Sequence, residues 1–100
     1  LMEKDNKLIA EFMGYEVKHN KCYSPKYNDG TIAPMQFHKS WDWLMPVVVE
    51  IVRDEDYQNY GFREYHNLWM MHNVPYGCID EVYEAVVTFI KSFNTKKEGE

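Results

Sequence analysis

A run of fourteen residues in the middle of the chain restricts the fold more than any other segment: Ser-Trp-Asp-Trp-Leu-Met-Pro-Val-Val-Val-Glu-Ile-Val-Arg, at positions 40–53. Ser40 is a good N-cap, and Asp42 lies in the first turn, where a negative charge suits the helix dipole. One broad apolar face recurs at helical spacing: Trp41, Leu44, Met45, Val48, Ile51 and Val52. Pro46 and the β-branched residues 47–49 oppose a regular helix, but a proline costs least near the first turns. The run therefore predicts a helix with a kink near Pro46.

Two further helices are predicted, one at each end of the chain. Residues 5–13 carry one apolar stripe, made of Leu8, Ile9, Phe12 and Met13. Gly14 follows, where a helix would end. Residues 78–93 show the clearest helical period, with apolar side chains at Ile79, Val82, Tyr83, Val86, Phe89, Ile90 and Phe93.

Three strands are predicted between these helices. Residues 15–19 alternate, and residues 31–38 form the return strand after a polar loop at 20–30 that contains the turn signal Asn28-Asp29-Gly30. Pro34 indicates an edge position or a bulge in the second strand. Residues 54–65 are predicted to be a loop, and the alternation within residues 64–73 favours a third strand.

The predicted order is therefore helix, strand, strand, helix, strand, helix. We expect an α+β fold, a small three-layer α/β/α sandwich around a mainly antiparallel three-stranded sheet, with a two-layer α/β sandwich as the alternative. A length of 100 residues suits one domain. We expect residues 1–94 to form it and residues 95–100 to be a frayed tail.

The run at 40–51 resembles a recurrent motif of small uncharacterised phage and prophage proteins, the family called the phage ABA (α/β/α) sandwich domain. Residues 6–14, Asn-Lys-Leu-Ile-Ala-Glu-Phe-Met-Gly, and 83–90, Tyr-Glu-Ala-Val-Val-Thr-Phe-Ile, are also similar to that pattern. Val49 departs from it, because the family often has a charged residue there. The resemblance implies an α/β/α fold and an origin in a mobile element, and it brings no functional residues with it.

Charge argues against general nucleic-acid binding. The chain has 16 acidic and 11 basic side chains, a net charge of -5, and an acidic surface repels phosphate backbones. Lys18, Lys21 and Lys26 could still bind a nucleic acid, because Tyr23 and Tyr27 interleave with them and could stack on bases. We interpret this segment as a solvated loop.

No membrane segment is predicted, because the longest apolar run, residues 44–49, is far shorter than the ~20 residues that span a bilayer. No signal-peptide pattern is visible. Cys22 and Cys78 are the only cysteines, and we predict two free thiols in a cytoplasmic protein.

Aromatic residues make up 16% of the chain and supply the main candidate site. Trp41 is predicted to face the core, which leaves Trp43 on another side of the same helix. We predict an exposed aromatic patch for protein interaction, formed by Trp43, Tyr57, Tyr60, Phe62 and Tyr65. The alternative is that these rings complete a small core.

Catalytic and metal signals are weak. His19 and Cys22 have a spacing that could supply two zinc ligands, but a structural site needs four. His66 and His72 would lie roughly 20 Å apart along an extended strand, too far to share a ligand. Cys78 precedes a helix, where a thiolate is favoured, yet Asp80 and Glu81 oppose this, so we predict a buried structural cysteine. Acidic residues 54–56 lack EF-hand spacing.

These observations predict a non-enzymatic protein-interaction module that is phage- or prophage-derived and able to self-associate, with no cofactor and no metal. Two alternatives stay open: a small enzyme or metal-binding protein that uses Cys78 and a histidine, and a nucleic-acid-binding accessory protein.

Overall fold

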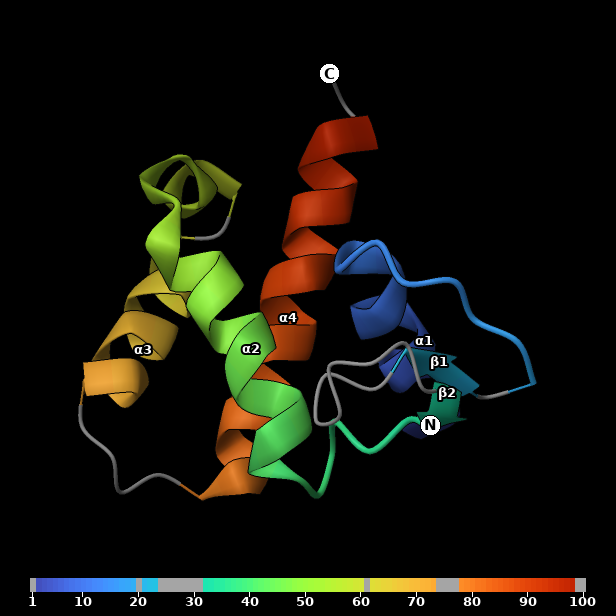
Figure 1. Cartoon of the computed structure of the whole chain (residues 1–100). Coiled ribbons are helices and arrows are strands. Elements are labelled where there is room, and N and C mark those ends of the chain that lie inside the picture. Colours follow the sequence, from blue (N-terminus) through green and yellow to red (C-terminus); the bar gives the residue numbers. More distant parts are fainter. Residues whose placement is uncertain (1, 20, 24–31, 61, 74–77, 99–100) are drawn as a thin grey trace.

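The structure is a computed structural model, which describes residues 2–19, 21–23, 32–60, 62–73 and 78–98 (Figure 1). The element order is α1 (Met2–Phe12), β1 (Lys21–Tyr23), β2 (Ile32–Pro34), α2 (Trp41–Arg53), the short 3₁₀ helix η1 (Glu55–Tyr60), α3 (Phe62–Asn73) and α4 (Ile79–Glu98). The helices predicted at the start, the middle and the end of the chain are confirmed. α4 continues through Glu98, beyond the predicted end at residue 93.

α2 begins after Ser40, as predicted, and contains Pro46. Its buried residues are Trp43, Leu44, Val47, Val48 and Ile51. The two tryptophans exchange their predicted roles, because Trp43 is 3% exposed and Trp41 is 40% exposed. The cause lies before the helix: the buried Phe37 ring packs edge-on against Trp43, with 5.1 Å between the ring centroids. The segment that leads into α2 thus extends the core over Trp43.

The predicted third strand is wrong, because residues 62–73 form α3. The segment has no β-branched residue, so its backbone has little preference for a strand. Tyr65 and Leu68, three residues apart, are buried, as one face of a helix requires. The residues predicted as a loop form η1 and the first turn of α3. The Tyr65 hydroxyl donates a hydrogen bond to the Val52 carbonyl, 3.1 Å away, and so joins α3 to α2.

The sheet is small, and it pairs β1 with β2 in antiparallel register: Lys21 with Pro34, Cys22 with Ala33 and Tyr23 with Ile32. Among the described residues β2 has no other partner strand, so the predicted edge position of Pro34 is confirmed. The strand predicted at 15–19 is reduced to one bridge, Lys18 with Lys21. His19 turns the chain between them with a φ of 51°. Gly14, with a φ of 80°, ends the turn after α1, which is the conformation that favours glycine.

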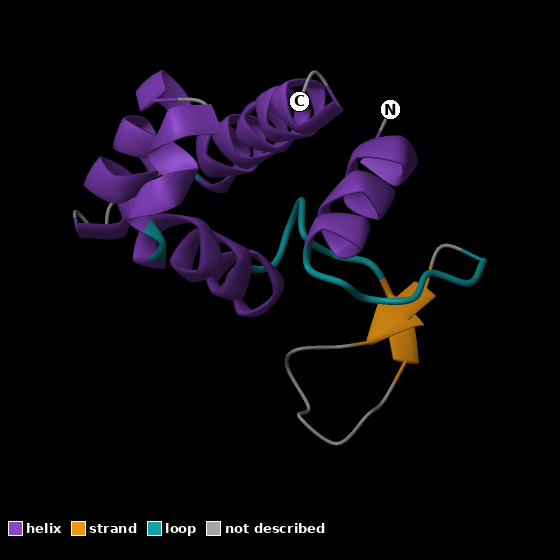
Figure 2. Cartoon of the chain, turned by 90° about the horizontal axis from the view of Figure 1, so that it is seen from above, coloured by secondary structure: helices purple, strands orange, loops and turns teal. Residues whose placement is uncertain are grey.

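The helices form the body of the molecule. α2 and α3 pack with α4, and α1 packs on α4 from the side opposite to α3 (Figure 1). Figure 2 shows β1 and β2 at the margin, beyond α1 and away from the other helices. The protein is therefore a small compact α+β protein with a radius of gyration of 13.0 Å, close to the ~13 Å expected for this length. A three-layer sandwich is not confirmed, because the described sheet has two strands and lies at the edge.

Among the described helices, none has both the length and the apolar character needed to cross a bilayer.

Candidate functional site

The predicted aromatic patch is not assembled on the surface. Trp43 and Tyr65 are buried, so the prediction that they face solvent is wrong. Tyr57 is half-buried and contacts the rings of Phe12, Phe89 and Phe93. The side chains of Tyr60 and Phe62 lie outside the described part of the structure. The described members of this set therefore complete the core, which was the alternative interpretation.

A different apolar surface lies on α3. Trp69 and Met70 are each 47% exposed, and they share one side of the helix with the exposed residues Arg63, His66 and Asn67. We call these five residues the outer face of α3. The imidazole of His66 stacks on the Trp69 ring, with the planes at 13° and the centroids 6.4 Å apart. The strand predicted within residues 64–73 does not form this surface, whereas a helix with apolar residues on opposite sides has a second contact surface.

A second group of side chains meets between α1, α4 and the turn before α2. Asn6 is 2% exposed, and its Nδ2 donates a hydrogen bond to His38 Nδ1 at 3.1 Å. The Tyr83 hydroxyl donates to Asn6 Oδ1 at 2.9 Å. Burial, and then the nearby Asp5 carboxylate, raise the pKa of Tyr83 to about 12. Asp5 also lies 3.8 Å from Lys91 Nζ. No spacing rule in the sequence points to this set, which we call the Asn6 network: Asp5, Asn6, His38, Tyr83 and Lys91.

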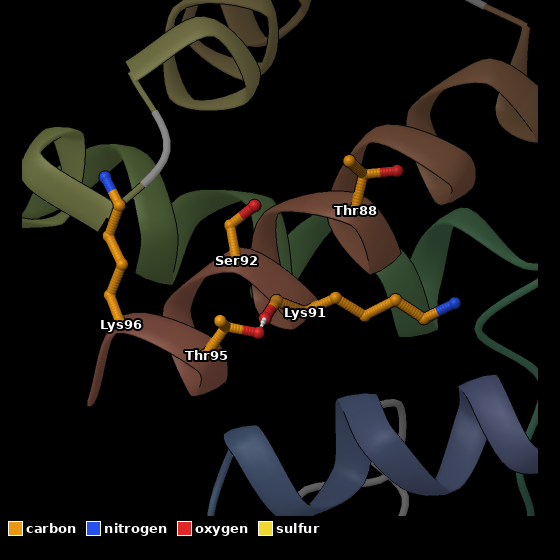
Figure 3. Close-up of a pocket in the computed structure, with 5 residues that line it drawn as sticks. All are labelled: Thr88, Lys91, Ser92, Thr95 and Lys96. Carbon is orange, nitrogen blue, oxygen red and sulfur yellow. Dashed lines mark hydrogen bonds between the residues drawn. The ribbon is translucent and has the colours of Figure 1, made fainter. Parts of the chain in front are cut away.

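A shallow groove of about 300 Å³ runs along α4 (Figure 3). Five residues of α4 line the groove: Thr88, Lys91, Ser92, Thr95 and Lys96. Lys96 Nζ donates to the Asn59 carbonyl at 2.9 Å, and the Thr95 hydroxyl donates to the Lys91 carbonyl at 2.9 Å. Since both ammonium groups already face oxygen atoms of the protein, the groove provides no unpaired cation for an anionic ligand.

The described cysteine and histidine candidates do not come together in a metal site. The Cys22 side chain is fully buried, whereas the His19 side chain is exposed. Burial raises the pKa of the Cys22 thiol to about 11, which disfavours the reactive thiolate. Cys78 is exposed, so its predicted burial is wrong; its carbonyl accepts hydrogen bonds from the first turn of α4. In the described part of the chain, no three His, Cys, Asp or Glu side chains are grouped to hold a metal.

The charged candidates are surface residues. Lys18 and Lys21 are exposed, Lys18 lies 3.8 Å from Glu16, and Lys26 lies outside the described residues. In the acidic run, the Asp54 carboxylate accepts a hydrogen bond from the backbone N–H of Asp56, which closes a local turn. His66 belongs to the outer face of α3, and the side chain of His72 lies outside the described part.

Comparisons of this chain with protein-family models, with curated proteins and with solved structures find no match.

Proposed function

We propose that this protein is a non-enzymatic interaction module that binds a partner protein through the outer face of α3. The observation that carries the proposal is the exposure of Trp69 and Met70 beside each other on that helix. Their inward neighbours Tyr65 and Leu68 already anchor α3 to the core. The outward pair keeps about half of its surface open to solvent, and tryptophan, methionine and arginine are enriched where proteins bind one another.

The charge of the outer face favours a partner with an apolar patch rimmed by carboxylates. Arg63 is the charged member of the face among its described side chains. The chain as a whole has a net charge of -5. Arg63 thus places a positive charge beside the apolar pair on an otherwise acidic molecule, and this charge favours a partner surface that carries carboxylates.

The proposal includes an origin and a location. The motif at residues 40–51 supports a relationship to the phage ABA sandwich proteins, which would make the partner a phage or host protein. Two cysteines that are free thiols support a reducing compartment, the cytoplasm.

Site-specific photo-crosslinking in the producing cell tests the proposal. A photoreactive phenylalanine analogue at position 69 is expected to give one discrete adduct, and the same analogue at position 32 none. Ile32 is the matched control, because it is also an exposed apolar residue and lies in β2, across the molecule from α3 (Figure 1). An adduct of twice the chain mass would identify a second copy and overturn the choice of an acidic partner of another sequence.

The purified partner then decides whether the contact is specific. Trp69→Ala is expected to weaken its binding at least tenfold, because a central tryptophan commonly contributes more than about 1.4 kcal/mol to an interface. Ile32→Ala should leave the affinity unchanged. Equal affinity of both variants, identical adducts from both positions, or no adduct at all would refute the proposal.

A further inference from the structure

The amide of Asn6 has one hydrogen-bond partner on each side, and the directions of the two bonds are linked. Its Nδ2 donates to His38 Nδ1, and its Oδ1 accepts from the Tyr83 hydroxyl. This pattern requires Nδ1 of His38 to be unprotonated, with the single imidazole proton on Nε2. Because Asn6 is almost fully buried, water cannot easily replace either partner.

We propose that Asn6 is a two-position amide that reverses when His38 becomes protonated, so that a pH-sensitive relay joins α1, the turn before α2 and α4. A proton from solvent that binds Nδ1 turns this nitrogen into a donor, which then faces the donor Nδ2. Rotation of the amide by 180° about its last side-chain bond restores both contacts. Oδ1 then accepts from His38, and Nδ2 donates to the Tyr83 oxygen.

The relay ends at Tyr83, which is buried on α4. In the reversed position the Tyr83 oxygen accepts, so its own proton turns towards solvent or towards the Asp5 carboxylate, which already acts electrostatically on Tyr83. The titratable groups that the described contacts bring to His38 are Tyr83 directly, and Asp5 and Lys91 through it. His38 is half-buried, which leaves it within reach of solvent protons. The relay shares no residue with the outer face of α3 and stands independently of the proposed function.

Nuclear magnetic resonance of the wild-type protein between pH 8 and pH 5 tests the relay. Long-range proton–nitrogen spectra distinguish the two imidazole nitrogens, and we expect neutral His38 to carry its proton on Nε2. The side-chain amide signals of Asn6 and the ring signals of Tyr83 should then shift with the same midpoint as the His38 imidazole. Neutral His38 protonated on Nδ1, or Asn6 signals that stay constant while His38 titrates, would overturn the proposal.

Three variants sharpen the test. His38→Gln should abolish the pH-dependent shift of the Asn6 amide, and His66→Gln, which alters an exposed histidine on α3, should preserve it. Asn6→Asp supplies a carboxylate that accepts from protonated Nδ1 without reversing, so the His38 midpoint should rise by about one pH unit or more. A midpoint that stays the same or falls would contradict the relay. If a variant does not fold, the wild-type titration decides alone.

Discussion

The side-chain amide of Asn6 is buried, so its hydrogen bonds contribute to the free energy of unfolding. Tyr83→Phe keeps the ring in the core and removes the hydroxyl that donates to Asn6 Oδ1. The oxygen is then buried without a hydrogen bond, and we expect the free energy of unfolding to fall by about 1–3 kcal/mol. Chemical denaturation followed by circular dichroism measures the change. Thr95→Ala is the matched control, because it removes an exposed hydroxyl bond on the same helix and should cost less than about 0.5 kcal/mol. Equal losses in both variants would contradict this account of Asn6.

Two buried acids make the protein sensitive to alkaline pH. Folding raises the pKa of Cys22 from 9.0 to about 11 and that of Tyr83 from 10.0 to about 12. The unfolded chain therefore loses these protons first, and the free energy of unfolding should fall as the pH rises from 9 to 12. Denaturation at a series of pH values measures the slope. Cys22→Ala should make the fall between pH 9 and pH 11 shallower. Cys78→Ser controls for the loss of a thiol, and an unchanged slope in Cys22→Ala would speak against a buried, protonated Cys22.

The residues differ in how far the sequence could place them. Ile9, Leu44 and Phe89 are buried, as their helical periods predict. The roles of Trp41 and Trp43 could not be read from α2 alone, because Phe37, in the segment before the helix, decides which ring is covered. The Asn6 network could not be predicted from the sequence, for a different reason. Its hydrogen bonds join residues 32 and 77 positions apart, and no periodicity relates polar side chains over such distances.

Among the elements, α3 allows a direct comparison of helix and strand. A strand would place Leu68 and Met70 on the same face, whereas α3 buries Leu68 and exposes Met70. We expect Leu68→Ala to lower the free energy of unfolding by about 2–5 kcal/mol. Met70→Ala should change it by less than about 0.5 kcal/mol. Denaturant titration of the two variants checks this, and comparable losses would favour the strand.

The helices that the sequence placed correctly, α1, α2 and α4, are those whose apolar residues recur with a clear 3.6-residue period. The strand prediction within residues 64–73 is wrong because the apolar residues of this short segment also fit an alternating pattern. Helix and strand are hard to distinguish there from the pattern alone. The same error hid the candidate site, because the outer face of α3 exists only if Trp69 and Met70 lie on a helix.

At the scale of the whole molecule, four aromatic rings join segments that are distant in the sequence. Phe12 of α1, Tyr57 of η1, and Phe89 and Phe93 of α4 contact one another in every pair, with centroids 5.4–6.4 Å apart. Aromatic pairs of this kind add about 0.5–1.5 kcal/mol beyond the area they bury. The cluster therefore connects the first helix, the middle of the chain and the last helix.

We expect the near-ultraviolet signal of the packed aromatic side chains and the far-ultraviolet signal of the helices to disappear together on unfolding, as in a two-state transition. Phe12→Ala should lower the free energy of unfolding by about 1–3 kcal/mol, because a half-buried ring leaves the cluster. Trp41→Ala removes a more exposed ring and should have a smaller effect. Loss of the near-ultraviolet signal before the helical signal would show that the aromatic packing and the helices do not unfold cooperatively.

The contact between Asn6 and Tyr83 also orders events during protein synthesis. Asn6 is synthesised 77 residues before Tyr83, whose hydroxyl donates a hydrogen bond to it. α1 therefore leaves the ribosome long before α4. Until then water hydrates Oδ1 of Asn6, and the side of α1 that packs on α4 stays exposed. The nascent chain can pack α2 against α3 early, but α1 can pack on α4 only after α4 has been translated.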